Sequence, residues 1–119
     1  MDKTQQITQQ LVDRHPWQRY LAEFIGTFAI VFAACGSVIS NGSTNGAVTL
    51  IGMAFAPGLM VLAMIYALGP ICAAHFNPAV TLAFATTRRF PWRHVPAYLI
   101  AQVAGALLAC GLHQVLYGR

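Results

Sequence analysis

The chain has 119 residues, of which 57% are hydrophobic and only 8% are charged. A soluble domain usually carries about 25% charged residues, so this composition excludes a water-exposed globular protein. Residues 24–87 and 94–118 contain no Lys, Arg, Asp or Glu, whereas a membrane-spanning helix needs only about 20 mainly apolar residues. The sequence therefore predicts an all-α integral membrane protein with three or four passes and no separate soluble domain.

The positive charges lie at the ends of the apolar segments. The net charge of +4 therefore does not predict a nucleic-acid partner. If the apolar segments cross the membrane as described below, six of the seven cations fall on one side. Because cytoplasmic loops carry the excess of Lys and Arg, we expect a multi-pass cell-membrane protein with a cytoplasmic N-terminus and an outside C-terminus. The cations are Lys3, Arg14, Arg19, Arg88, Arg89, Arg93 and Arg119.

A polar cytoplasmic N-terminal segment, residues 1–19, precedes a membrane domain, residues 20–119. The predicted spans are residues 21–40, 46–69 and 95–117, each consisting mainly of apolar residues. Between the first two, residues 41–45 carry Asn, Gly, Ser and Thr, which are typical of a turn. Tyr20, Trp92 and Tyr117 fall at predicted span ends, where aromatic side chains anchor helices at the membrane interface.

Residues 70–87 are uncharged but too broken by prolines to cross the membrane as one helix. Asn77 followed by Pro78 indicates a helix start, because Asn is a favoured N-cap and Pro suits the first helical position. A half-helix from Asn77 to Thr87 would be roughly 16 Å long, about half of the ~30 Å apolar core. We therefore predict a re-entrant segment, whose extended part must be buried in protein or line a wet path. An ordinary kinked core helix is the alternative.

Other residues point mainly to structural roles. Cys35, Cys72 and Cys110 are odd in number and lack metal-type spacing, so neither a zinc site nor a disulfide framework follows. His113 lies near the end of the third span and is expected to be interfacial rather than functional. Small residues recur every four positions, which is typical of helix-packing faces in lipid; they are Ala29, Ala33, Ser37, Ala97, Ala101, Gly105 and Ala109.

Three motifs together resemble one family. His75-Phe-Asn-Pro-Ala-Val-Thr81 resembles the first Asn-Pro-Ala box of the aquaporin, or major intrinsic protein, family. Ala22-Glu-Phe-Ile-Gly-Thr-Phe28 is similar to the family's first-span signature, and Tyr98-Leu-Ile-Ala-Gln-Val-Ala-Gly-Ala106 to its third-span signature. The resemblance is to the N-terminal half of a bacterial-type water or glycerol channel. It implies three transmembrane helices plus one re-entrant half-helix, which is half of the inverted-repeat fold.

The resemblance implies a passive channel for water or small neutral solutes such as glycerol, with no enzymatic activity, cofactor or metal. The side-chain amide of Asn77 would donate to a passing solute at the pore centre. Pro78 would lock the start of the half-helix, and Ala79 would pack against a second box at the midplane. Backbone carbonyls would form a polar ladder on one pore wall; they belong to Ala73, Ala74, His75 and Phe76. Cys72 would be a small loop residue or would offer mercurials a thiol near the pore.

Two further positions follow from the resemblance. Glu23 would accept hydrogen bonds from the backbone of the re-entrant loop, which is a structural role. An intramembrane carboxylate is also a functional candidate, so a small proton-coupled transporter that uses Glu23 is the outside alternative. Pro57 falls where the family's second span usually contributes an aromatic side chain to the outer constriction. The choice between water and glycerol therefore stays open.

The chain carries one half-repeat only, without the second box. Three spans alone do not bury a re-entrant backbone, so we expect a second half-repeat as partner, either as a separate chain or as another copy. A truncated, non-conducting family member that needs a second half or full-length subunits is the alternative function. The family resemblance also implies a homotetramer in a lipid bilayer.

Overall fold

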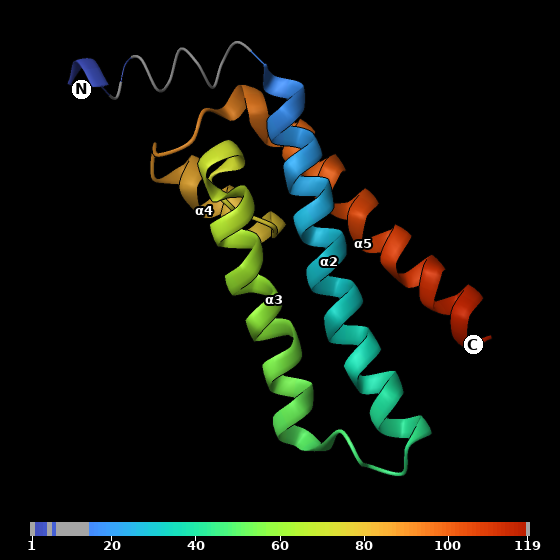
Figure 1. The fold of residues 1–119 in the computed structure, drawn as a ribbon. Coiled ribbons are helices and arrows are strands. Elements are labelled where there is room, and N and C mark those ends of the chain that lie inside the picture. Colours follow the sequence, from blue (N-terminus) through green and yellow to red (C-terminus); the bar gives the residue numbers. More distant parts are fainter. Residues whose placement is uncertain (1, 5, 7–14, 119) are drawn as a thin grey trace.

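The computed structural model describes residues 2–4, 6 and 15–118. Figure 1 shows α2 and α3 as an antiparallel pair, with α5 beside α2 and the short α4 near the N-terminal end of α5. Between residues 15 and 118, three α-helices are long and apolar enough to cross a membrane and one is short, which confirms the predicted fold class. In chain order the elements are α2 (Pro16–Ser43), α3 (Thr49–Cys72), α4 (Pro78–Thr86), the 3₁₀ turn η1 (Trp92–His94) and α5 (Val95–Tyr117).

Helix α2 begins at Pro16, five residues before the predicted span. Proline is compatible with the first helical position because its missing N–H would have no partner there. Arg19 lies within this helix and is buried, with its guanidinium 5.7 Å from the ring centre of Phe90 and 5.8 Å from that of Tyr98. Arg19, which the sequence analysis placed in the polar segment before the first span, therefore lies inside a helix. Most of the predicted polar segment, residues 1–19, lies outside the described residues.

Helices α2 and α5 run parallel and pack through small residues. A Cβ atom added to Gly105 of α5 would lie 2.5 Å from the Phe24 carbonyl oxygen of α2, so only glycine permits this approach. Eight residues further along both helices, the His113 Nε2–H donates to the Phe32 carbonyl oxygen at 2.9 Å. His113 is thus buried between the two helices, four residues before the end of α5. The sequence analysis missed this because the partner oxygen belongs to the backbone of another helix.

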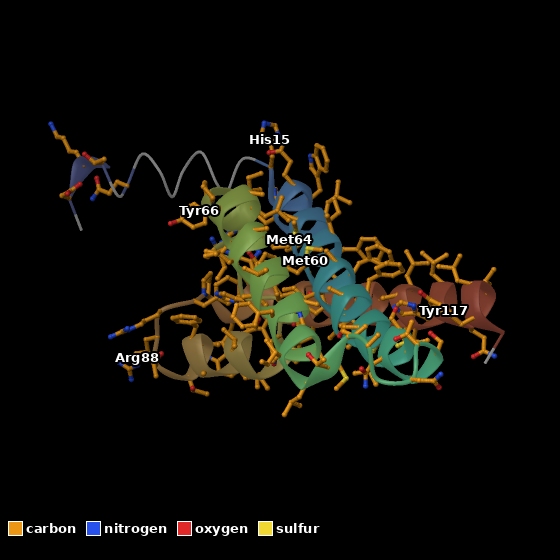
Figure 2. The ribbon with its side chains drawn as sticks, turned by 60° about the horizontal axis from the view of Figure 1, so that its bottom comes forward. His15, Met60, Met64, Tyr66, Arg88 and Tyr117 are labelled. Atoms are coloured by element: carbon orange, nitrogen blue, oxygen red, sulfur yellow. The ribbon has the colours of Figure 1, made fainter. Side chains whose placement is uncertain are left out.

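Helix α3 contains two prolines and continues through the second one. It ends at Cys72, whereas the predicted span ends at residue 69 because Pro70 was expected to break it. Proline is tolerated in membrane helices because neighbouring groups satisfy the freed backbone. Most of α3 faces away from the other helices, as Figure 2 shows for Tyr66, which is 79% exposed. In a membrane this face must contact lipid or another protein segment, because its large apolar side chains would otherwise be hydrated.

Candidate functional site

The loop between α3 and α4 holds three non-glycine residues in the left-handed region. The φ angles are 66° at Ala73, 53° at Ala74 and 53° at Phe76. Each such residue costs of order 1–3 kcal/mol and persists only where surrounding structure holds it. In this conformation the loop forms no helical ladder, and the described residues donate no hydrogen bond to four consecutive carbonyl oxygens. These carbonyls belong to Ala73, Ala74, His75 and Phe76.

The side chain of Glu23, on α2, binds the backbone of this loop. Its side chain has no exposed surface, and its two carboxylate oxygens accept from the backbone of the loop. The His75 N–H lies 2.9 Å from Oε1, and the Phe76 N–H lies 2.7 Å from Oε2. Hydrogen bonds to an ionised acceptor are about twice as strong as neutral ones. The carboxylate therefore satisfies two buried N–H groups that the loop conformation leaves without backbone partners.

A second tie comes from α5. The Gln102 side-chain amide donates to Glu23 Oε2 and to Thr81 Oγ1, each at 2.9 Å. Thr81, on α4, also pairs with Nδ1 of His75 at 3.0 Å. One network therefore connects α2, the loop, α4 and α5. The sequence analysis assigned no role to Gln102 or Thr81. The amide of Gln102 in an otherwise apolar span does, however, indicate that a buried hydrogen-bond partner is needed.

Aromatic rings enclose the His75 side chain. Its ring centre lies 4.9 Å from that of Phe84, 4.7 Å from that of Phe90 and 5.3 Å from that of Tyr98. The Tyr98 hydroxyl donates to the Cys72 carbonyl oxygen at 2.7 Å, which anchors the last residue of α3 to α5. Tyr98 also received no role in the sequence analysis. Its hydroxyl fixes where the loop leaves α3.

Cys72 lies away from any open surface of the loop. It has no exposed surface, and its thiol contacts the Leu68 carbonyl oxygen and the Ala74 N–H, each at 3.4 Å. The sequence analysis left open whether this thiol is accessible to mercurials. In this conformation it is not.

Asn77 is the N-cap of α4, and this role fixes the orientation of its amide. Its Oδ1 accepts from the Ala79 N–H at 2.8 Å. The amide nitrogen must then point away from the helix, and no described residue accepts a hydrogen bond from it. Asn77, Pro78 and Ala79 are all exposed in this chain. The site thus presents one free amide donor directly after the four free carbonyl acceptors.

A groove of about 440 Å³ lies along the exposed face of α4 and begins at Val80, three residues after Asn77. Its walls include Val80 and Phe84, which follow Asn77 at three and seven residues and therefore share its side of the helix. The groove ends at Thr87 and Arg89, where Figure 2 shows the neighbouring Arg88 pointing away from the bundle. The open face of α4 is therefore polar at both ends and apolar between them.

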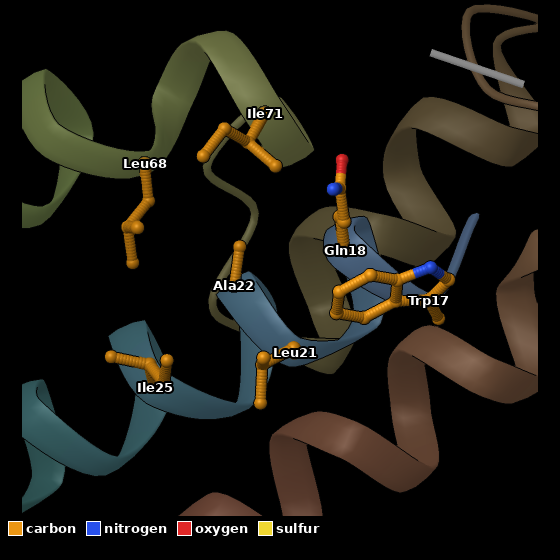
Figure 3. A pocket seen from close by; sticks show the side chains of 7 residues that line it. All are labelled: Trp17, Gln18, Leu21, Ala22, Ile25, Leu68 and Ile71. Carbon is orange, nitrogen blue, oxygen red and sulfur yellow. The ribbon is translucent and has the colours of Figure 1, made fainter. Parts of the chain in front are cut away.

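Pro57 does not belong to this network. It lies inside α3, fifteen residues before Cys72, which corresponds to about 22 Å along a helix. A separate cavity of about 300 Å³ lies between α2 and α3 and contains none of the predicted site residues (Figure 3). Its walls are mainly apolar, with Leu68 and Ile71 on the α3 side and Ala22 and Ile25 on the α2 side. Within the described residues no group of three or more His, Cys, Asp or Glu forms a metal site.

Comparison with known proteins gives strong matches over nearly the whole chain. The model of the family described as "Major intrinsic protein" matches residues 10–119. Aquaporin NIP1-1 from Oryza sativa subsp. japonica is 55% identical over 101 residues, which cover 85% of this chain and 36% of the relative. Aquaporin NIP1-1 from Zea mays is 54% identical over 101 residues, with 85% and 36% covered.

A relative from a third plant gives a similar match. Aquaporin NIP1-1 from Arabidopsis thaliana is 48% identical over 101 residues, which cover 85% of this chain and 34% of the relative. The chain therefore spans about a third of the length of these relatives. All three are plant NIP-type proteins, so the bacterial-type part of the predicted resemblance finds no support.

Proposed function

Because the chain belongs to the major intrinsic protein family, we propose that it is the first half-repeat of a passive channel for water or small neutral solutes. In this proposal the loop 73–77 forms one wall of the pore, and a second half-repeat forms the other. The family consists of membrane channels rather than enzymes.

One observation carries the proposal, namely the row of four free carbonyls that ends at the free amide of Asn77. Free backbone carbonyls are tolerated at membrane depth only where they face protein or water. A row of acceptors followed by one donor suits a file of water molecules, which pass as both donors and acceptors. The partial positive charge at the N-terminus of α4 would oppose cations at the same point.

The pore proposal requires a second half-repeat, because the face of α4 that would line the pore is exposed in this chain. Asn77, Pro78 and Ala79 are open in this chain, and the groove along α4 has no opposite wall. A pore needs this face to be covered by protein rather than by lipid. We propose that a second half-repeat, supplied by another chain rather than by a second copy, covers it. The completed channels would form the homotetramer implied by family resemblance.

The arrangement of Glu23 disfavours the transporter alternative. Among the residues that the structure describes, its three hydrogen-bond partners are all donors, and two of them are backbone N–H groups. A carboxylate that exchanges a proton with substrate needs access to water in at least one state, and this one has no exposed surface. We therefore propose that Glu23 has a structural role, in which it accepts hydrogen bonds from the backbone of the loop.

We propose that the N-terminus and residues 88–93 face the cytoplasm. Arg88 and Arg89 follow the C-terminal end of α4, where the helix dipole favours positive charge. The start of α2 and the loop after α4 lie at the same end of the bundle in Figure 1, which agrees with the excess of positive charge expected on the cytoplasmic side.

Osmotic shrinkage of liposomes, followed by stopped-flow light scattering, tests the function. The chain is reconstituted alone and together with the part of the rice relative that lies C-terminal to the matched region. We expect shrinkage at the rate of bare lipid from the chain alone. We expect fast shrinkage with low temperature dependence from the pair.

Two results would overturn the proposal. Fast shrinkage from the chain alone would show that one half-repeat is sufficient. Shrinkage at the bare-lipid rate from a pair that co-purifies would show that the loop does not conduct. A pH-sensitive dye inside the liposomes tests the transporter alternative, because proton-coupled exchange would change the internal pH whereas passive water flow would not.

A further inference from the structure

The loop between α4 and α5 carries a dense positive charge. Its arginines, Arg88, Arg89 and Arg93, are exposed, and no acidic residue lies between them. The whole sequence has only three acidic residues, all within its first 23 positions. Of these, Glu23 is fully buried and holds the loop before α4. The segment 88–93 therefore carries positive charge alone.

Two buried side chains fix this loop against the bundle. The ring centre of Phe90 lies 4.6 Å from that of Tyr98 and 4.7 Å from that of His75. Four residues further, His94 Nδ1 lies 2.7 Å from the Tyr20 hydroxyl of α2. Phe90 and His94 are both buried, so the residues beside them are held in place. The loop thus presents its arginines in a fixed arrangement.

Arg88 directly follows the last turn of α4 and has left-handed backbone. Its φ angle is 61°, and the next N–H, that of Arg89, donates to the Phe84 carbonyl oxygen at 2.8 Å. Glycine is the usual residue at this position of a helix end. The Arg88 side chain points away from the bundle in Figure 2. An outward arginine therefore stands where glycine is the conformationally favoured residue.

Trp92 indicates the depth of the loop in a membrane. Its side chain is 57% exposed, and exposed tryptophans next to membrane-spanning helices lie at the level of the lipid headgroups. Trp92 is three residues from Arg89 and adjacent to Arg93, so these arginines lie near the same level. The planar guanidinium group matches the oxygens of a phosphate, which it binds through two parallel hydrogen bonds.

From these observations we propose that segment 88–93 is a binding surface for anionic phospholipids, whose headgroup phosphates pair with Arg88 and Arg89. The partner is a lipid rather than a soluble anion, because Trp92 holds these arginines at headgroup depth. An anionic headgroup attracts each arginine, whereas the choline cation of phosphatidylcholine opposes them. The inference requires that the chain inserts into a bilayer, and it does not depend on whether the chain conducts.

Quenching of Trp92 fluorescence by lipids with brominated acyl chains tests the proposal. The full chain carrying Trp17→Phe, in which Trp92 is the remaining tryptophan, is reconstituted in liposomes of phosphatidylcholine mixed with anionic phosphatidylglycerol. Either lipid is brominated in turn, and the quenching gives the ratio of their binding constants beside Trp92. We expect this ratio to favour phosphatidylglycerol by about fivefold per arginine and to decrease in high salt, which screens exposed charges.

Two variants of the Trp17→Phe chain separate the site from overall charge. In Arg88→Asn/Arg89→Gln, where asparagine suits the left-handed backbone, we expect the two lipids to bind within about twofold of each other. The matched control Lys3→Asn/Arg14→Gln removes the same charge from the N-terminal segment and should keep the preference for phosphatidylglycerol. Melting temperatures in detergent confirm that each variant folds.

Four results would overturn the proposal. Equal quenching by the two lipids in the Trp17→Phe chain would show that no preference exists. An unchanged preference in Arg88→Asn/Arg89→Gln would show that these arginines do not carry it. An equal loss in the control would reduce the effect to net charge. Loss of the preference in inorganic phosphate, but not in sodium chloride of the same ionic strength, would indicate a site for a soluble anion instead.

Discussion

The side-chain amide of Gln102 lies 2.9 Å from Glu23 Oε2 and 2.9 Å from Thr81 Oγ1, so one group on α5 ties α2 to α4. Glu23 in turn holds the backbone of the loop through His75 and Phe76. Three segments that are far apart in the sequence, namely α2, the loop with α4, and α5, therefore share one buried polar network. Such networks stabilise only when their members are satisfied, which makes each member a sensitive target for substitution.

The first prediction concerns Glu23→Gln. Glutamine has one acceptor oxygen and one NH₂ group, so a donor would face one of the buried donors that the carboxylate satisfies. Leaving a buried donor without a partner costs about 1–3 kcal/mol. We expect the free energy of unfolding in detergent to fall by this amount, together with a lower yield of folded protein.

Thr27→Val, one turn further along α2, is the matched control. The Thr27 hydroxyl is buried without a hydrogen-bond partner within the described residues. Its removal should be neutral or slightly stabilising, because no bond is lost. Equal destabilisation by both substitutions would contradict the role assigned to Glu23.

Gln102→Leu should loosen the network from the side of α5. It removes the only side-chain donor to Glu23 that the structure describes and one bond to Thr81. Hydrogen bonds to charged groups contribute about 1.5–3 kcal/mol, so we expect thermal unfolding in detergent to reveal a loss of that order. Gln114→Leu makes the same change at an exposed position of α5 and should have little effect. A wild-type melting temperature for Gln102→Leu would be evidence against the network.

Tyr98→Phe tests the anchor between α3 and α5. The substitution keeps the ring against His75 and removes only the hydroxyl that donates to the Cys72 carbonyl. We expect a loss of about 1 kcal/mol, measured by chemical denaturation in detergent. Tyr66→Phe, at a side chain that is 79% exposed, should be neutral. If both variants behave alike, the hydroxyl of Tyr98 does not anchor α3.

Gly105→Ala should disturb the seam between α2 and α5. The new methyl group would lie 2.5 Å from the Phe24 carbonyl oxygen, which is backbone and has no room to move aside. Overpacking of this kind typically costs about 1–3 kcal/mol. Gly111→Ala, which meets nothing within 4 Å, should instead be neutral or stabilising by up to about 1 kcal/mol. Thermal unfolding of the two variants in detergent measures this difference. A Gly105→Ala variant as stable as Gly111→Ala would contradict the close approach of the two helices.

Local signals predicted the start of α4 well. Asn77 and Pro78 specify a helix N-terminus through their own backbone preferences, and the structure has α4 beginning at Pro78 with Asn77 as its cap. The three long apolar helices were likewise predictable, because their composition alone requires a membrane. In contrast, Pro70 was a misleading signal, since a membrane helix tolerates proline where neighbours satisfy its backbone.

The features that were not predicted all depend on which helix faces meet. Gln102 reaches Glu23 across 79 residues, and His113 reaches the backbone of Phe32 across 81. No local pattern encodes such pairs, because they follow from the register of two packed helices. Arg19 was missed for the same reason, since only the folded chain brings Phe90 and Tyr98 over its guanidinium. A buried polar residue in an apolar span therefore predicts a partner without identifying it.

The most direct test of the central claim separates the two roles of Asn77. Asn77→Asp keeps an oxygen for the Ala79 N–H, and Asp is about as good an N-cap as Asn, but it removes the amide donor and adds a negative charge. We expect the variant, paired with the complementary part of the rice relative, to melt like wild type and to shrink liposomes no faster than bare lipid. Wild-type water permeability in a correctly folded Asn77→Asp channel would contradict the claim that this amide lines the pore.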